Sequence, residues 1–333
     1  MDDLKVCIVG CGDIVQISHL EHWEKNPHSR VYSCVDIDPE VARSTAETTS
    51  AEVWLTDYEE AFADPAVDAV DIALPHQLHR PAVEAACAAG KPILCEKPMA
   101  MNVADGQAMI DAAAAAGLPL SIRHTTRYDA VNVEMKRQIA SGAIGEPLFG
   151  SIRTGGLIPC ERLGGLPYWH WFKNRAAGGG AIAGVGVHGV DVLLWLVGGT
   201  VKAAYGVGGR HMMEAGFPGD TDNDVEDTAS LSIALEGGCV LNVIACWTLR
   251  GPKPPTQVHG SDGALFATGD GLLMIDGNGG ERRLDTPPVT RTITDDFVDH
   301  LRAGGPLPAP ADEVIESVKV LEACYGTIDP LLE

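Results

Sequence analysis

Residues 5–20 read KVCIVGCGDIVQISHL, and this stretch decides the fold. Its apolar run, residues 6–9, has the length of a buried strand rather than of a helix. Gly10, Cys11 and Gly12 follow at once, and an apolar-periodic segment begins after them, which predicts a strand, a glycine turn and a helix. Glycines in such a turn let the backbone approach a pyrophosphate, and the helix N-terminus offers free N–H groups to its phosphates. Val15 stands where a third small residue is expected, and a strand–turn–helix without a ligand is the alternative.

Length, composition and charge set the class of protein. The 333 residues predict about two domains, and a hydrophobic content of 45% is typical of a globular protein. No apolar run approaches the length of a transmembrane helix, and the acidic start MDDLKVCIVG is not expected to be a signal peptide. The nine cysteines lack metal-ligand spacing, which favours reduced thiols in a cytoplasmic protein. The net charge of −22 disfavours nucleic acid and anionic membrane as partners.

A second predicted strand, residues 30–35, ends in the sequence Asp36-Ile37-Asp38. An acid at this spacing after the glycine turn is placed to bind the adenosine ribose hydroxyls of a dinucleotide. Asp36 would accept a hydrogen bond from the 2′-hydroxyl and repel a 2′-phosphate, and Asp38 adds to that repulsion. The sequence therefore favours NAD(H) over NADP(H). In the alternative interpretation Asp38 only caps the helix that starts near Glu40, which leaves Asp36 free.

The alternation of strands and helices continues to residue 123. Further strands are predicted at residues 68–74, 92–95 and 118–123, and helices at residues 81–89 and 99–116. Short links between them predict an N-terminal Rossmann domain, residues 1–123, with a doubly wound parallel sheet that binds ligands at the carboxyl ends of its strands. The candidate cofactor-binding residues at those ends are Gly10, Gly12, Asp13, Ile14, Asp36, Ile37, Leu74, Pro75, His76, His79, Glu96 and Lys97.

The character of the sequence changes after residue 123. Segments of alternating or β-rich character occur at residues 148–152, 202–207, 228–235, 239–247 and 256–259, and helices are predicted at residues 132–141, 180–196, 295–302 and 311–325. This pattern predicts a C-terminal α+β domain, residues 124–333, with a large, mostly antiparallel sheet that binds substrate. One face of such a sheet is left over after packing, so we expect a homodimer or a dimer of dimers.

Several motifs occur in a specific order. Residues 88–98, AAGKPILCEKP, are similar to the signature A-G-K-x-V-x-x-E-K-P. Further matches are Pro75 with His79, Thr126-Arg127-Tyr128, Gly178-Gly179-Gly180, Gly186-Val187-His188 with Asp191, Glu226-Asp227 and Gly260-Ser261-Asp262-Gly263. Over nearly the whole chain, this ordered set resembles the Gfo/Idh/MocA family, named after glucose–fructose oxidoreductase, inositol dehydrogenase and rhizopine catabolism.

The resemblance implies a dehydrogenase or reductase that transfers a hydride between NAD(P) and a sugar, cyclitol or related polyol or keto-sugar. Such a reaction needs a group that takes up and returns the hydroxyl proton, and a lysine does this when its pKa is lowered by burial or nearby positive charge. Lys97 follows a buried strand and is the candidate acid/base, with His188 as a second catalytic residue. The plainer interpretations are a solvated surface lysine and a core histidine.

The candidate substrate-binding residues are His124, Arg127, Tyr128, Trp171, Gly184 and His188. The family has an aspartate four residues before the histidine, where this chain has Gly184. That departure favours one alternative, a non-catalytic NAD-binding regulator, and a second alternative is a glycosidase-like or epimerase-like enzyme with transient oxidation. His76 and His79 raise the question of a metal, but they lack a set of partners at ligand spacing, so we expect no metal site.

Overall fold

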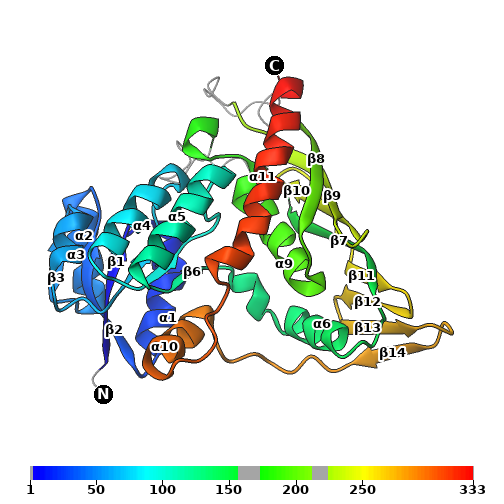
Figure 1. The fold of residues 1–333 in the computed structure, drawn as a ribbon, viewed down its shortest axis with the longest axis horizontal. Coiled ribbons are helices and arrows are strands. Elements are labelled where there is room, and N and C mark those ends of the chain that lie inside the picture. Colours follow the sequence, from blue (N-terminus) through cyan, green and yellow to red (C-terminus); the bar gives the residue numbers. More distant parts are fainter. Residues whose placement is uncertain (1–2, 157–172, 212–223, 333) are drawn as a thin grey trace. The chain divides into compact units, whose positions relative to one another are not determined.

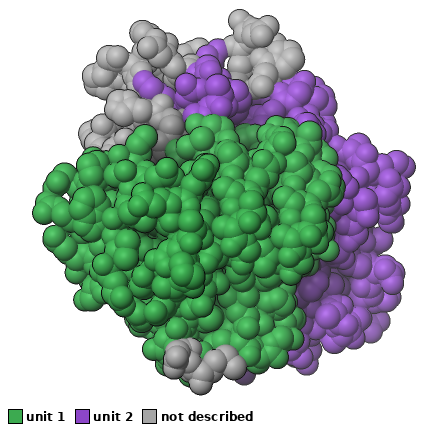
Figure 2. Space-filling model, turned by 60° about the vertical axis from the view of Figure 1, so that its left-hand side comes forward, with its two compact units in different colours: residues 1–124, 291–315 green, residues 125–290, 316–333 purple. Residues whose placement is uncertain are grey.

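The computed structural model describes residues 3–156, 173–211 and 224–332. The chain, drawn as a ribbon in Figure 1, divides into two compact units, which Figure 2 shows in different colours. Unit 1 comprises Met1–His124 and Arg291–Ile315, and unit 2 comprises Thr125–Thr290 and Glu316–Glu333.

Unit 1 is built on a six-stranded parallel sheet in the order β3-β2-β1-β4-β5-β6. Its strands are β1 (Leu4–Val9), β2 (Ser29–Val35), β3 (Val53–Leu55), β4 (Ala69–Ile72), β5 (Ile93–Cys95) and β6 (Leu120–Ile122). The order reverses between β1 and β4, and this switch point is where open α/β sheets bind ligands. The predicted doubly wound parallel sheet is therefore confirmed.

Helices connect these strands, and α4 and α5 pack on each other (Figure 1). Their bounds are α1 (Leu20–Lys25), α2 (Pro39–Thr49), α3 (Tyr58–Ala63), α4 (His79–Ala88), α5 (Val103–Ala116) and α10 (Ile293–Ala303), and a π-helical segment η1 (Val15–His19) precedes α1. Helix α5 begins later than the predicted residue 99, because the Asn102 side chain caps it by accepting from the Asp105 N–H at 2.8 Å.

The chain returns to unit 1 after residue 290. Thr294 accepts a hydrogen bond from Arg123 at 3.0 Å, Asp295 accepts one from Asn26 at 2.7 Å, and Ser121 bridges Pro310. The predicted second domain, residues 124–333, differs from unit 2 in this segment. Side chains far apart in sequence make these contacts, so local pattern carries no signal for them.

Unit 2 contains an eight-stranded sheet in the order β14-β13-β12-β11-β7-β10-β9-β8. Its strands are β7 (Pro147–Gly155), β8 (Val201–Gly209), β9 (Thr228–Leu235), β10 (Val240–Cys246), β11 (Thr256–Gly260), β12 (Gly263–Thr268), β13 (Gly271–Asp276) and β14 (Glu281–Leu284). Strands β7 and β10 pair in parallel and the other neighbours are antiparallel, which confirms the mostly antiparallel sheet. The sequence did not predict β12, β13 and β14.

Helices cover one face of this sheet. They are α6 (Ala130–Ala140), a π-helical segment η5 (Ile182–Gly186) with α9 (Val187–Val197), and the part of α11 (Ala311–Leu332) that belongs to unit 2. Gly189 of α9 lies so close to β7 that a Cβ there would stand 2.8 Å from the Ile152 and Thr154 side chains. By length and composition alone, Arg175–Val197 is apolar enough to cross a membrane. However, 78% of its most apolar 18-residue segment is buried inside the protein, as in the core helix of a folded domain.

Candidate functional site

The glycine turn after β1 has the geometry that a dinucleotide pyrophosphate requires. Gly10 has φ +84°, and a Cβ at this position would lie 2.3 Å from the carbonyl oxygen of Ala73. Only glycine fits there. Gly12 is exposed, and nothing within 4 Å would meet a Cβ, so its backbone is open to a ligand. Asp13 is half-buried and Ile14 is exposed beside it.

Asp36 is held beside this turn by two backbone N–H groups. Its Oδ2 accepts from Cys11 N at 2.8 Å and its Oδ1 accepts from Asp38 N at 3.0 Å. Asp38 caps α2 by accepting from the Glu40 N–H at 2.9 Å, so the two acids have different local roles. Ile37 is 92% exposed and offers an apolar surface next to Asp36.

Two histidines follow β4 and lie in the interior of unit 1. The His79 ring nitrogens lie 3.0 Å from the Pro98 carbonyl oxygen and 2.8 Å from the Leu74 carbonyl oxygen, so His79 joins the segments after β4 and β5. Burial lowers the pKa of His79. His76 is also buried and meets His79 edge to face at 5.7 Å between ring centroids. Leu74 and Pro75 are half-buried.

Glu96 and Lys97 follow β5 directly. Glu96 N donates to the Ile72 carbonyl at 2.8 Å, and Glu96 Oε2 accepts from Lys97 N at 3.0 Å. Burial acts to raise the pKa of Glu96, but His19, Lys97 and Arg123 outweigh it and hold the pKa well below its usual value. Lys97 is half-buried, and its peptide bond to Pro98 is cis.

The sequence interpretation missed the partners of Glu96. His19 of η1 lies 3.0 Å from Glu96 Oε1 through Nε2 and 2.9 Å from Asp71 Oδ2 through Nδ1. A signal existed at both positions, because an aspartate inside a buried strand and a histidine inside an apolar helix each need a partner.

The candidate substrate-binding residues lie in both units. His124 is buried at the end of unit 1, and Tyr128 of unit 2 is half-buried. Arg127 is buried in unit 2, where its Nε and Nη2 donate to the two carboxylate oxygens of Asp191 at 2.8 and 2.7 Å. This pair ties the segment after residue 124 to α9. Trp171 lies outside the described residues.

Gly184 and His188 lie on one continuous helical stretch of unit 2. Gly184 is buried within η5, and His188 is half-buried in the first turn of α9. Glu226 anchors the start of this stretch, because its Oε1 accepts from Ile182 N at 2.8 Å while Arg175 forms an ion pair with Oε2. The helix that carries His188 is therefore fixed at its N-terminal end.

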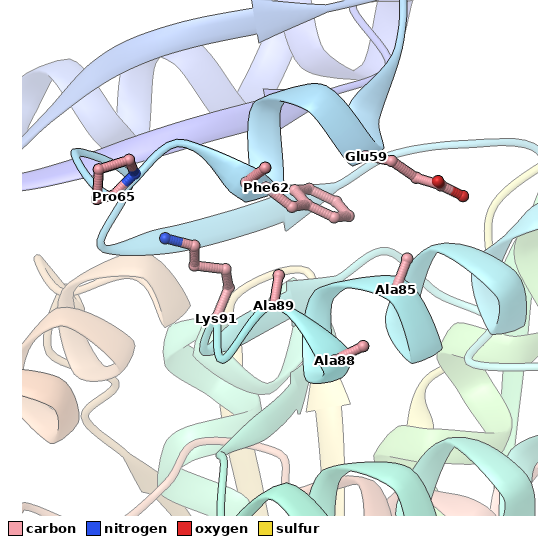
Figure 3. Close-up of a pocket in the computed structure, with 8 residues that line it drawn as sticks. Glu59, Phe62, Pro65, Ala85, Ala88, Ala89 and Lys91 are labelled. Atoms are coloured by element: carbon pink, nitrogen blue, oxygen red, sulfur yellow. The ribbon is translucent and has the colours of Figure 1, made fainter.

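A shallow surface pocket of about 660 Å³ in unit 1 contains none of the predicted site residues (Figure 3). Its lining residues are Glu59, Phe62, Ala63, Pro65, Ala85, Ala88, Ala89 and Lys91. Lys91 donates to the carbonyl oxygens of Asp64 and Val67 at 2.9 and 2.7 Å, so its charge holds the chain before β4. Among the described residues, no group of three or more His, Cys, Asp or Glu side chains is arranged to hold a metal ion.

Comparison with known families agrees with this geometry. Residues 4–124 match the model described as the oxidoreductase family with an NAD-binding Rossmann fold, and residues 132–266 match the GFO/IDH/MocA C-terminal domain. The chain belongs to the Gfo/Idh/MocA oxidoreductase family. Unit 1 is its NAD-binding Rossmann domain, as the glycine turn predicts. The open backbone at Gly12 and the oriented carboxylate of Asp36 fit NAD.

Curated relatives of this family member are named dehydrogenases and reductases, which confirms that it is an enzyme. The 1,5-anhydro-D-fructose reductase of Ensifer adhaerens is 32% identical over 64% of this chain and 60% of its own length, so the match spans less than two thirds of that relative. The D-apiose dehydrogenase of Rhizobium rhizogenes is 24% identical over 98% of this chain and 95% of its own.

Solved structures of the family share the fold. An aldose-aldose oxidoreductase from Caulobacter crescentus, complexed with glycerol, has a TM-score of 0.81 at 25% identity, and the match covers 98% of this chain and 97% of that one. A levoglucosan dehydrogenase in complex with NADH and levoglucosan has a TM-score of 0.83 at 22% identity, with the same coverage of 98% and 97%.

Proposed function

We propose that this protein transfers a hydride between NAD and a CH–OH group of a sugar, cyclitol or related polyol or keto-sugar, with Lys97 as the acid/base. The observation that carries the proposal is the position of Lys97. It follows β5 directly, on the carboxyl edge of the sheet where the glycine turn and Asp36 end β1 and β2. Its half-buried side chain is accessible to a substrate while its backbone is held by Glu96.

The residues of the chain have separate tasks in this proposal. Bound NAD supplies the hydride acceptor or donor. Gly10 and Gly12 admit its pyrophosphate, and Asp36 accepts from its ribose. Lys97 Nζ takes the hydroxyl proton of the alcohol during oxidation and returns it to the oxygen during reduction. His188 of unit 2 is the second proposed catalytic residue, because an imidazole can both donate and accept a proton.

The relatives' names support the substrate class, because they act on D-apiose, 1,5-anhydro-D-fructose, levoglucosan and myo-inositol. Gly184 supports a departure from the typical family chemistry, since it is buried on the stretch that carries His188 and has no carboxylate to offer. Transient oxidation without net redox change, as in a glycosidase-like or epimerase-like enzyme, is the alternative reaction.

The first experiment is a turnover screen over sugars, cyclitols and keto-sugars with NAD and NADH, following NADH absorbance and, by mass spectrometry, the product. Lys97→Met is expected to keep NADH binding and to lower kcat by about 10²- to 10⁴-fold on the substrate found. Lys25→Met removes a highly exposed lysine of the same unit and serves as the matched control, with turnover unchanged. Full activity in Lys97→Met would show that Lys97 is not the acid/base.

His188→Ala tests the second group. If both residues act in one proton relay, the double variant should cost less than the product of the two single losses. A product released without net NADH change would identify the epimerase-like or glycosidase-like candidate. NADH binding with no turnover on any of these compounds would reject the proposed substrate class.

A further inference from the structure

Five polar or aromatic side chains are buried together under the carboxyl edge of the unit 1 sheet, and of these only Glu96 enters the proposed function. Each comes from a different part of the Rossmann domain: the π-helical segment η1, helix α1, the middle of β4, and the residues after β5 and β6. They are His19, Trp23, Asp71, Glu96 and Arg123. His19, Trp23 and Asp71 are wholly inaccessible to solvent. Buried charges of this number are retained only when they are mutually paired.

The ring of His19 lies between two carboxylates. Its Nδ1 is 2.9 Å from Asp71 Oδ2, and its Nε2 is 3.0 Å from Glu96 Oε1. Trp23 Nε1–H, which only donates, reaches the same Asp71 oxygen at 2.6 Å. Ionised carboxylates only accept, so a ring bonded to both of them must carry a proton on each nitrogen.

The charges of the cluster balance in that state. The His19 imidazolium and the Arg123 guanidinium face the Asp71 and Glu96 carboxylates, and Arg123 stands 3.9 Å from Asp71 and 3.8 Å from Glu96. Those distances are ion-pair contacts rather than hydrogen bonds. Burial and the charge of Arg123 act to lower the pKa of His19, but the two carboxylates outweigh them and raise it above the usual 6.5.

Glu96 connects this cluster to Lys97. One carboxylate oxygen of Glu96 contacts His19, and the other accepts from the backbone N–H of Lys97 at 3.0 Å. A carboxylate held at both oxygens cannot rotate, so the ring of His19 fixes the peptide that carries the lysine. Arg123 makes its own hydrogen bonds to Thr294 at 3.0 Å and His22 at 2.7 Å, and its Nε stands 3.8 Å from Glu96 Oε1 without a hydrogen bond.

We infer that His19 is a positioning residue for Lys97: bridging Asp71 and Glu96, it orients the Glu96 carboxylate that holds the Lys97 backbone amide. The inference deepens the proposed function and rests on it for the activity readout alone. His19 touches neither substrate nor NAD in this assignment. Its contribution is expected in kcat, because a lysine displaced by about 1 Å loses of order 10²-fold in rate.

Two isosteric variants separate this role from a merely structural one. The amide nitrogen of asparagine stands near the place of His Nδ1, and that of glutamine near the place of His Nε2. His19→Gln therefore keeps a donor to Glu96 and loses the one to Asp71, whereas His19→Asn does the reverse. Both variants remove the same charge. A structural role predicts similar losses in the two variants.

The positioning role predicts an asymmetric result. His19→Asn should lower kcat by about 10- to 100-fold with KM and the NADH dissociation constant little changed, while His19→Gln stays within about 5-fold of wild type. Hydrogen exchange of the Lys97 amide, followed by NMR, should speed up in His19→Asn and stay protected in His19→Gln. Equal kcat losses with equal Lys97 exchange in the two variants would overturn the inference.

The readouts also distinguish this inference from the proposed function. A wild-type protein without turnover, but with Lys97 exchange that speeds up only in His19→Asn, would reject the proposed activity and retain the positioning role. If neither variant folds, long-range ¹H–¹⁵N NMR of the wild-type protein decides: both ring nitrogens of His19 should be protonated at neutral pH. A neutral His19 tautomer at neutral pH would reject the bridge.

Discussion

The backbone N–H of Cys11 donates to the side chain of Asp36 at 2.8 Å, and this bond ties the glycine turn to the acid that follows β2. The second oxygen of the same carboxylate accepts from Asp38 N at 3.0 Å. Asp36 is thus oriented before a dinucleotide arrives, which reduces the entropy lost on binding. This hydrogen bond therefore connects the two features that NAD needs, an open turn for the pyrophosphate and a carboxylate that accepts from the ribose.

Coenzyme preference follows from this carboxylate. We expect the wild-type protein to bind NADH more tightly than NADPH, and Asp36→Ser to reduce that preference by about 10-fold or more, because it removes the repulsion of a 2′-phosphate. Asp38→Ser removes the same charge next to the site and keeps a side chain that caps α2, so it should change the preference less. Fluorescence titration measures both. Tighter NADPH binding by the wild type would contradict the prediction.

The two glycines of the turn should respond differently to alanine. Gly10→Ala places a Cβ 2.3 Å from Ala73 O at φ +84° and should lower the free energy of unfolding by about 3 kcal/mol. Gly12→Ala meets no protein atom within 4 Å, so its stability should stay within about 0.5 kcal/mol of wild type while NADH affinity falls by about 10-fold. Urea unfolding and NADH titration measure the two effects. Equal losses of stability in Gly10→Ala and Gly12→Ala would show that the fold also requires a glycine at position 12.

The Arg127–Asp191 pair should matter for the stability of unit 2. Arg127→Met removes the two hydrogen bonds to Asp191 and the positive charge beside this buried carboxylate, and we expect a loss of about 3 to 5 kcal/mol in the free energy of unfolding. Adding Asp191→Leu removes that carboxylate as well, so the double variant should be more stable than Arg127→Met alone. Unfolding curves of Arg127→Met, Asp191→Leu and the double variant give the coupling energy between the two side chains. Additive losses of stability would contradict the prediction.

The buried cluster around His19 predicts in which direction the free energy of unfolding changes with pH. Because the pKa of His19 is raised in the folded state, its positive charge stabilises the fold fully below pH 6.5. This stabilisation is lost as the pH rises through the folded-state pKa. Burial acts to raise the pKa of Asp71 and of Glu96, but the positive partners lower both, so their contributions are lost as the pH falls below about 4.5. Urea unfolding across pH should therefore show the stability difference between wild type and His19→Asn narrowing above about pH 6.5. A difference that widens there would reject the charged bridge.

Association is expected through the open face of the unit 2 sheet. Tyr205 and Val207 of β8 are 53% and 50% exposed, and the register places them in rows with Asn242 and Ile244 of β10. Light scattering should show a homodimer or a dimer of dimers at micromolar concentration. Tyr205→Glu should dissociate it, whereas Trp54→Glu, at an aromatic position of unit 1 that is 45% exposed, should not. A monomeric wild type would contradict the prediction.

Local pattern was sufficient for much of this protein. The strand–glycine–helix order, the acid after the second strand and the alternation to residue 123 specify the Rossmann sheet, because each depends on neighbours in sequence. Antiparallel character after residue 124 also followed from alternation and turns. Strands β12 to β14 were not predicted, and their hairpin pairing at the end of the sheet is seen only in the structure.

The sequence by itself determined the fold class, the NAD-binding turn and Lys97 as the residue to test. Only the tertiary structure decided that His79 lies between two backbone carbonyls, that Arg127 is paired with Asp191, and that residues 291–315 return to the first unit. It also revealed His19 between Asp71 and Glu96, which are 52 and 77 residues away in the chain. Hydrogen bonds and ion pairs act over a few ångströms in space, and no periodicity of the sequence records which distant side chains the fold brings within that range.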